Sequence, residues 1–321
     1  MTAGWVAAST RGRSLLRRTI GPEGVRAIAT AATWADGRSM LSSTAYGTEL
    51  PPTADRRAAR SAATASTIWQ LRVLAGWLPP SSSGLARTFA APMELGNIEQ
   101  HLILLERSGD ELDRSEAERR RPTSLGSLGT AWPRVGRARS IPQVRDILAR
   151  SAWGDPGGSD RAAIILGLRV RWGRRLVRQA PITSEWVQGA TAVLVARERF
   201  TFGRTIHEMA ARDLDQLVGP RWRRATSLDH LVERLPRSAA WPFEATVAAS
   251  GPADESLWLS EHAVVERVTA DARRLTETGR NSRGTVSAVM ALLLIDLWQV
   301  HAAIESAGRT PVPQEVFDAV A

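Results

Sequence analysis

The chain has 321 residues, a formal net charge of +9, a hydrophobic fraction of 43% and a charged fraction of 23%. These values are typical of a globular protein with a sizeable buried core and argue against a disordered chain. The sequence contains no cysteine, which excludes disulfides, thiolate metal sites and cysteine nucleophiles.

The sequence also contains no lysine, so arginine supplies all 42 Lys and Arg positions. A Walker A phosphate loop, a Schiff-base lysine and a kinase lysine are therefore excluded in their standard forms. Complete use of arginine indicates a coding bias, which weakens the net charge as evidence for a phosphate-binding face. An Arg-rich, all-helical nucleic-acid-binding protein is kept as the alternative function.

Apolar residues recur at spacings of three and four along most of the chain, which predicts an all-α fold. The last clear helix contains Asp296 and is too short for a bilayer span, so it is predicted to be buried. Breaks rich in Gly, Pro and Ser are predicted at 78–84, 153–160 and 248–256, and a charged, solvated connector at 110–124. In chain order, the clearest predicted helices cover residues 5–18, 64–78, 163–177, 186–200, 259–277 and 286–300.

One pattern occurs three times: Ala, any residue, Ser or Thr, a large apolar residue, then Leu seven positions later, followed by Ser or Thr, Ala and an aromatic ring. The first Ser or Thr is predicted to cap a short helix, and the apolar residue and the Leu to share its buried face. The tryptophans at repeat positions, Trp34, Trp153 and Trp241, and also Trp298, are predicted to belong to the core rather than to stack on nucleobases. The three copies are Ala31, Thr33, Trp34, Leu41, Thr44, Ala45 and Tyr46; Ala138, Ser140, Ile141, Leu148, Ser151, Ala152 and Trp153; and Ala225, Ser227, Leu228, Leu235, Ser238, Ala239 and, one position late, Trp241.

No catalytic, metal-binding or cofactor motif is present, and the five histidines never fall at the i, i+4 spacing of a helical metal site. Two polar pairs interrupt apolar helices, Glu94 with Asn97 and Asp296 with Gln299. Each pair is three residues apart and therefore shares a helix face. The pairs are read either as a solvated helix edge or as a polar stripe that faces a partner or an internal cavity.

The ordered motifs resemble a known family. "MLSSTAYG" at 40–47 is similar to an L-x-x-T-x-Y-G element, and "MELGNIEQHL" at 93–102 to a D/E-x-x-N-I helix. With residues 125–153 and the closing segment 292–320, they resemble the AC39 family, the C/d-type rotor subunits of the V-type (A/V-type) ATPases. The segment 190–200 departs from this pattern, because it has no acid-x-x-Asn.

The resemblance implies three similar helical units around a pseudo-threefold axis that form a funnel. It implies a non-catalytic rotor adaptor, peripheral on the cytoplasmic face of the membrane, whose partners are the central-stalk subunits and the membrane c-ring. Neither nucleic acid, nucleotide, metal nor cofactor is expected to bind. The expected units are 1–78, completed by the C-terminal helices, 79–158 and 159–248, with 249–321 closing the ring. The expected lining or partner-contact residues are Glu94, Asn97, Asp296 and Gln299.

Overall fold

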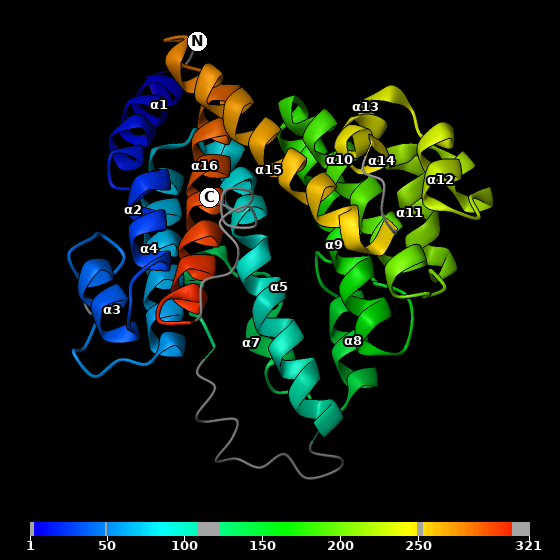
Figure 1. Ribbon diagram of the computed structural model, residues 1–321, viewed down its shortest axis with the longest axis horizontal. Coiled ribbons are helices and arrows are strands. Elements are labelled where there is room, and N and C mark those ends of the chain that lie inside the picture. The colour runs from blue at the N-terminus through cyan, green and yellow to red at the C-terminus, as the bar shows by residue number, and fades with distance from the viewer. Residues whose placement is uncertain (1–2, 49, 108–121, 249–252, 310–321) are drawn as a thin grey trace. The chain divides into compact units, whose positions relative to one another are not determined.

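The structure is a computed structural model that describes residues 3–48, 50–107, 122–248 and 253–309 (Figure 1). All regular structure in these ranges is helical, which confirms the all-α prediction. The chain divides into two compact units, here called the split unit (1–89 with 265–321) and the central unit (90–264). The four-part division expected from the resemblance stays a prediction. Three predicted features lie wholly or partly outside the described residues: the connector at 110–124, the break at 248–256 and the closing segment beyond 309.

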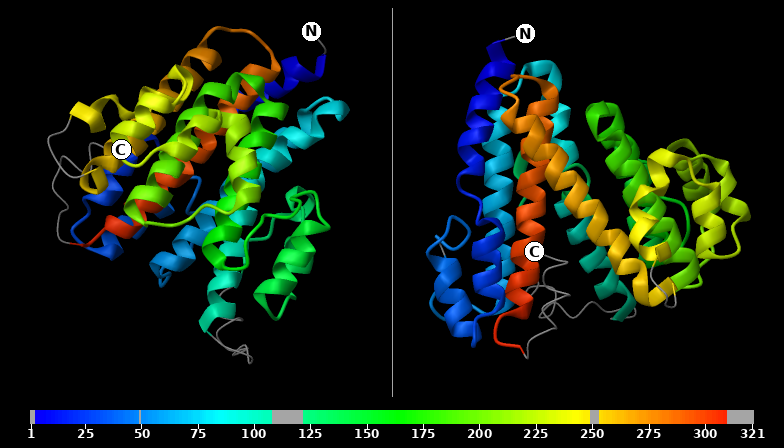
Figure 2. Two further views of the ribbon diagram at one scale, coloured as in Figure 1. Left: turned by 90° about the vertical axis from the view of Figure 1, so that its right-hand side faces the viewer. Right: turned by 45° about the horizontal axis from the view of Figure 1, so that its top comes forward.

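The split unit is built around one apolar helix, α16 (Arg283–Ser306). Around it pack α1 (Ala3–Leu16), α2 (Gly21–Ala29) and α4 (Arg56–Trp77), a packing that can be followed in Figure 2. The short α3 (Trp34–Ser42) packs on α2. A 3₁₀ turn, η1 (Pro80–Ser82), leads into the long α5 (Ser83–Arg107), and α15 (Ala253–Glu277) precedes α16.

By length and composition α16 is apolar enough to cross a membrane, and 67% of its most apolar window is buried inside the structure. Fourteen of the 24 residues of α16 are buried, which confirms the prediction of a buried helix. The prediction that this segment is too short for a bilayer span is wrong, because the helix extends beyond the apolar run at both ends. The prediction that Trp298 belongs to the core is wrong, because its side chain is 47% exposed. A helix that is apolar on all sides gives no periodic signal to tell its covered side from its open side.

The central unit continues α5 and adds a series of shorter helices. Within it, α10 packs on α9, α11 and α13. The 3₁₀ and π segments in this unit are η2 (Gly126–Leu128), η3 (Pro181–Thr183), the π-helix η4 (Arg197–Thr201), η5 (Pro220–Arg224) and η6 (Trp241–Phe243). The α-helices are α7 (Trp132–Val135), α8 (Ile141–Ala149), α9 (Arg161–Gln179), α10 (Ser184–Ala196), α11 (Glu208–Val218), α12 (Leu228–Arg234), α13 (Arg237–Ala240) and α14 (Glu244–Ala248).

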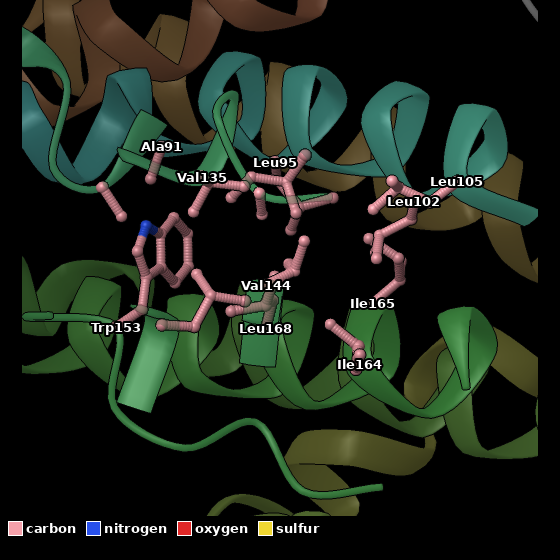
Figure 3. Close-up of a cluster of buried hydrophobic side chains, with 14 residues drawn as sticks. Ala91, Leu95, Leu102, Leu105, Val135, Val144, Trp153, Ile164, Ile165 and Leu168 are labelled. Atoms are coloured by element: carbon pink, nitrogen blue, oxygen red, sulfur yellow. The ribbon is translucent and has the colours of Figure 1, made fainter. Parts of the chain in front are cut away.

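One core cluster of the central unit joins α5, α7, α8 and α9 (Figure 3). Leu102 of α5, Val144 of α8 and Leu168 of α9 are fully buried in it. The indole of Trp153 stands at one end of the cluster, with its nitrogen toward Ala91 of α5. This packing fixes α5 against the short helices that follow it in the chain.

The three predicted caps are confirmed. The side-chain oxygens of Thr33, Ser140 and Ser227 accept the backbone N–H three residues later, at 3.2, 3.4 and 3.2 Å. These bonds begin α3, α8 and α12, respectively. The leucine seven positions after each large apolar residue is also buried, at 0, 0 and 8% exposure for Leu41, Leu148 and Leu235. Of the large apolar residues themselves only Leu228 is buried, whereas Trp34 and Ile141 are partly exposed, so the prediction of a shared buried face is wrong for these two.

Candidate functional site

Glu94 of α5 holds the start of the short helix α7, an arrangement we call the Glu94 clamp. Its Oε1 accepts the backbone N–H groups of Thr130, Ala131 and Trp132 at 2.7, 2.6 and 2.8 Å. The first N–H groups of a helix have no partner within it and carry the positive end of its dipole, so a carboxylate is favourable there. Glu94 is fully buried, and these bonds offset the cost of burying its charge.

The aromatic ring of the second repeat copy completes the Glu94 clamp. Trp153 donates its indole N–H to Oε2 of Glu94 at 3.0 Å. The guanidinium of Arg175 in α9 lies 5.2 Å from the centre of the same ring, within the range of a cation–π contact. Burial lowers the pKa of Arg175, and the charge of Glu94 acts in the opposite direction. A carboxylate, an indole and a guanidinium thus tie α5, α7 and α9 together.

Asp296 of α16 makes the corresponding arrangement in the split unit, the Asp296 clamp. It accepts the backbone N–H groups of Ile20 and Gly21 at the start of α2, at 3.3 and 3.0 Å. Its Oδ2 also accepts the hydroxyl of Tyr46, the ring of the first repeat copy, at 2.5 Å. Burial, and then the charge of Asp296, raises the pKa of Tyr46 far above its ordinary value. The hydroxyl therefore stays protonated and remains a donor.

The residues before each ring set its position in the same way in both copies. Thr44 donates its hydroxyl to the carbonyl of Leu41 at 2.7 Å and accepts the N–H of Tyr46 at 3.2 Å. Ser151 does the same with the carbonyl of Leu148, at 2.7 Å, and the N–H of Trp153, at 3.1 Å. The Ser/Thr-Ala-aromatic ending is therefore a side-chain turn that aims the ring at the carboxylate.

The third copy is built differently from the other two. Trp241 packs on α10 at Gly189, where a Cβ would lie 2.5 Å from Cζ2 of the ring. The acid in the segment that departs from the family pattern, Glu198, pairs instead with Arg204 at 3.3 Å. The clamp is therefore a feature of the first two copies, in keeping with the departure at 190–200.

The four predicted site residues are all buried, with exposures of 0% for Glu94, 7% for Asn97, 5% for Asp296 and 8% for Gln299. The reading as a solvated helix edge is therefore wrong. Asn97 bonds the backbone of Thr123 in both directions, at 2.8 and 3.0 Å. The hydrogen-bond partners described here for Glu94, Asn97 and Asp296 lie in the same unit as the residue that they bind. Direct contact of any of the four residues with another protein stays a prediction.

The geometry of the clamps is that of a structural brace. The two oxygens of Glu94 accept four N–H donors, and the side chain has no exposed surface. A general base or nucleophile needs a lone pair within reach of a substrate, and this carboxylate offers none. Over the described part of the chain, no group of three or more acidic or histidine side chains is placed to hold a metal ion.

Several partners in the clamps were not predicted from the sequence. These are the backbone N–H groups at the starts of α2 and α7, and the guanidinium of Arg175. A proline in the first turn of each short helix, Pro22 and Pro133, was the available signal, because proline is favoured where its missing N–H is not needed. Comparison with known proteins gave no matching family model and no matching curated protein.

Proposed function

We propose that the chain is the non-catalytic rotor adaptor of a V-type ATPase, a protein of the AC39 type that links the central shaft to the membrane proteolipid ring. In this proposal three similar helical units surround a pseudo-threefold axis and form a funnel, peripheral on the cytoplasmic face. Rotation coupled to ion transport passes through it without chemistry in the adaptor itself. Its partners are the central-stalk subunits and the c-ring.

The observation that carries the proposal is the repeated clamp. Asp296 and Glu94 each hold the start of a short, Pro-containing helix and each accept a hydrogen bond from the ring of a repeat copy. These carboxylates and rings lie in the four segments on which the resemblance to the AC39 family rests. A single capped helix is common. The same combination of a buried acid, a Pro-containing helix start, a hydrogen-bonding ring and a Ser/Thr turn before that ring occurs twice in this chain, which supports internal repetition.

The physics of the clamps suits a part that transmits torque. An adaptor between two rotating bodies needs units that keep their shape under load, and buried charge-assisted hydrogen bonds are among the strong non-covalent ties. The clamps join helices that lie far apart in sequence, as with the 250 residues between Tyr46 and Asp296. Both carboxylates are buried, with exposures of 0% for Glu94 and 5% for Asp296, in keeping with a structural role.

Affinity purification tests the proposal. The tagged full-length chain is recovered from detergent-solubilised membranes of cells that naturally encode it, and co-purifying proteins are quantified by mass spectrometry. We expect stoichiometric central-stalk subunits and proteolipid. A double variant, Glu94→Gln with Asp296→Asn, should lower their recovery, whereas Glu99→Gln on the same helix as Glu94 should not. Recovery of soluble, unrelated proteins alone would overturn the proposal.

Solution scattering tests the funnel separately. A three-lobed particle with a central hollow is expected for the purified chain. A compact bundle without a hollow would contradict the funnel, whatever the result of the affinity purification.

A further inference from the structure

The second half of α4 carries two exposed tryptophans on one side of the helix. Trp69 and Trp77 are 44 and 51% exposed, and Val73 midway between them is partly exposed. Residues four apart follow one another along a helix face, so the three side chains extend over about 12 Å of one face. We call them the tryptophan stripe. A single exposed apolar side chain is usual, whereas a contiguous apolar stripe is a candidate binding surface.

Helix α1 lies along the tryptophan stripe. Gly4, Arg11 and Arg18 recur at intervals of seven, so they share one side of α1 and of the turn that follows it. The Cζ of Arg18 lies 5.2 Å from the centre of the Trp69 ring. At the other end, a Cβ on Gly4 would lie 3.1 Å from Cγ of Pro79, which comes just after α4. This side of α1 therefore faces α4, and it carries Arg11, whose Nε is buried without a hydrogen-bond partner.

The cations of this surface lack acidic partners. Residues 1–22 and 56–93 contain four and five arginines, respectively, and neither stretch contains Asp or Glu. Arg17 and Arg72 are exposed, and within the described ranges neither side chain forms an ion pair or a hydrogen bond. Arg72 follows Trp69 by three residues, so it stands beside the stripe. A coding bias explains why these cations are arginine, but it does not explain why acids are absent.

We propose that the tryptophan stripe and the arginines beside it bind an anionic lipid surface. The indole ring suits the boundary between head groups and acyl chains because it has an apolar body and a polar N–H. The unpaired guanidinium groups attract the lipid phosphates, and the absence of acids removes the repulsion that would oppose this contact. The site goes beyond the adaptor proposal, whose partners are proteins, and does not depend on it.

Other anionic partners fit the stripe less well. With exposures of 44 and 51%, the two indoles together offer only about 150–250 Å² of surface. A stable protein interface covers about 800 Å² on each partner, whereas a fluid lipid surface accepts a narrow stripe without a matching pocket. A second copy of the chain would bring one positive surface against another. Single-stranded nucleic acid stacks on free aromatic faces, and Arg18 lies over the ring of Trp69.

Sedimentation of the purified full-length chain with lipid vesicles tests the site. We expect binding to mixed vesicles of phosphatidylglycerol and phosphatidylcholine that weakens as salt rises, and little binding to phosphatidylcholine alone. The double variant Trp69→Ala with Trp77→Ala should weaken binding to the anionic vesicles at least about tenfold, because it removes most of the apolar area. Arg72→Gln should weaken it about fivefold and reduce its salt dependence.

Two matched controls change the same chemistry elsewhere in the chain. Trp258→Ala removes an indole that is 40% exposed on α15. Arg150→Gln removes one positive charge from the end of α8, where Arg150 pairs with Asp146 at 2.9 Å. Both variants should bind the anionic vesicles within about twofold of the wild type, because neither group belongs to the surface that meets the lipid.

Several outcomes would overturn the lipid site. These are failure of the wild type to bind the anionic vesicles, wild-type binding by the double Trp variant when circular dichroism shows it folded, and equal losses in the stripe and control variants. Tighter binding to single-stranded DNA or to polyglutamate, lost in the same variants, would assign the surface to nucleic acid or to an acidic protein instead. If the double variant fails to fold, the exposed Arg72→Gln decides between the same outcomes. The adaptor proposal is tested separately, by the affinity purification.

Discussion

Replacing Glu94 by Gln tests whether the Glu94 clamp stabilises the central unit. The carboxylate accepts three backbone N–H groups, from Thr130, Ala131 and Trp132, and the indole N–H of Trp153. An amide keeps only one oxygen, so its NH₂ group must face at least one of these donors. The lost charged bond and the unpaired donor cost about 1.5–3 kcal/mol, and the lost charge at the helix start about 0.3–1 kcal/mol.

We therefore expect Glu94→Gln to lower the free energy of unfolding by about 2–4 kcal/mol, a large part of the roughly 5–15 kcal/mol of a typical protein. Urea unfolding followed by circular dichroism measures it. Glu99→Gln on the same helix is the control, since Glu99 makes only a partly exposed ion pair with Arg169 at 3.8 Å, worth less than about 1 kcal/mol. Equal stability of the two variants would refute the clamp.

Three further predictions follow from the structure. Tyr46→Phe removes the hydroxyl bonded to the α16 carboxylate and should cost about 1.5–3 kcal/mol of unfolding free energy; an unchanged urea midpoint would contradict it. Gly189→Ala places a methyl 2.5 Å from the ring of Trp241 and should destabilise the protein by about 1–3 kcal/mol. Gly76→Ala, with open space around it, should stabilise it by up to about 1 kcal/mol. Changes of the same sign in the thermal unfolding midpoints of the two variants would refute the packing. Burial lowers the pKa of His301 to about 4 in the folded protein, so as the pH falls this histidine is protonated in the unfolded chain before it is protonated in the folded one. The free energy of unfolding should therefore drop between pH 6.5 and 4 by about 1–2 kcal/mol more than it does in His301→Gln. Parallel pH profiles of stability for the two proteins would count against this prediction.

The local parts of the repeat were predictable from sequence. Ser and Thr before an apolar residue mark a helix start because the cap bond reaches only three residues along the chain, as at Thr33, Ser140 and Ser227. The burial of Leu41 and Leu148 follows from helical periodicity. Each of these features is decided within about two helical turns.

The clamps themselves were not predictable in the same way. Glu94 and Asp296 stand out in sequence as polar residues in apolar helices, but their partners are backbone N–H groups, which carry no sequence signal. Those partners lie 36 and 275 residues away, at Thr130 and Gly21. The pattern therefore identified the acids and left open whether they lie on a solvated helix edge or face a partner or an internal cavity, and the hydrogen bonds to backbone N–H groups were not foreseen.

The two clamps differ in the length of the acid and in the position of the donor on the ring, and this difference can be tested. The shorter acid, Asp296, meets Tyr46, whose donor sits at the far tip of its ring, and the longer Glu94 meets Trp153, whose donor nitrogen lies nearer the backbone. If acid length and ring reach compensate, Glu94→Asp and Trp153→Tyr should each destabilise the central unit by about 2 kcal/mol through a stretched or lost charged bond. The double variant should then be more stable than the sum of the two losses predicts, with a coupling of about 1 kcal/mol in a urea double-mutant cycle. Strict additivity would mean that the two clamps both pair an acid with a hydrogen-bonding ring but do not share a common geometric design.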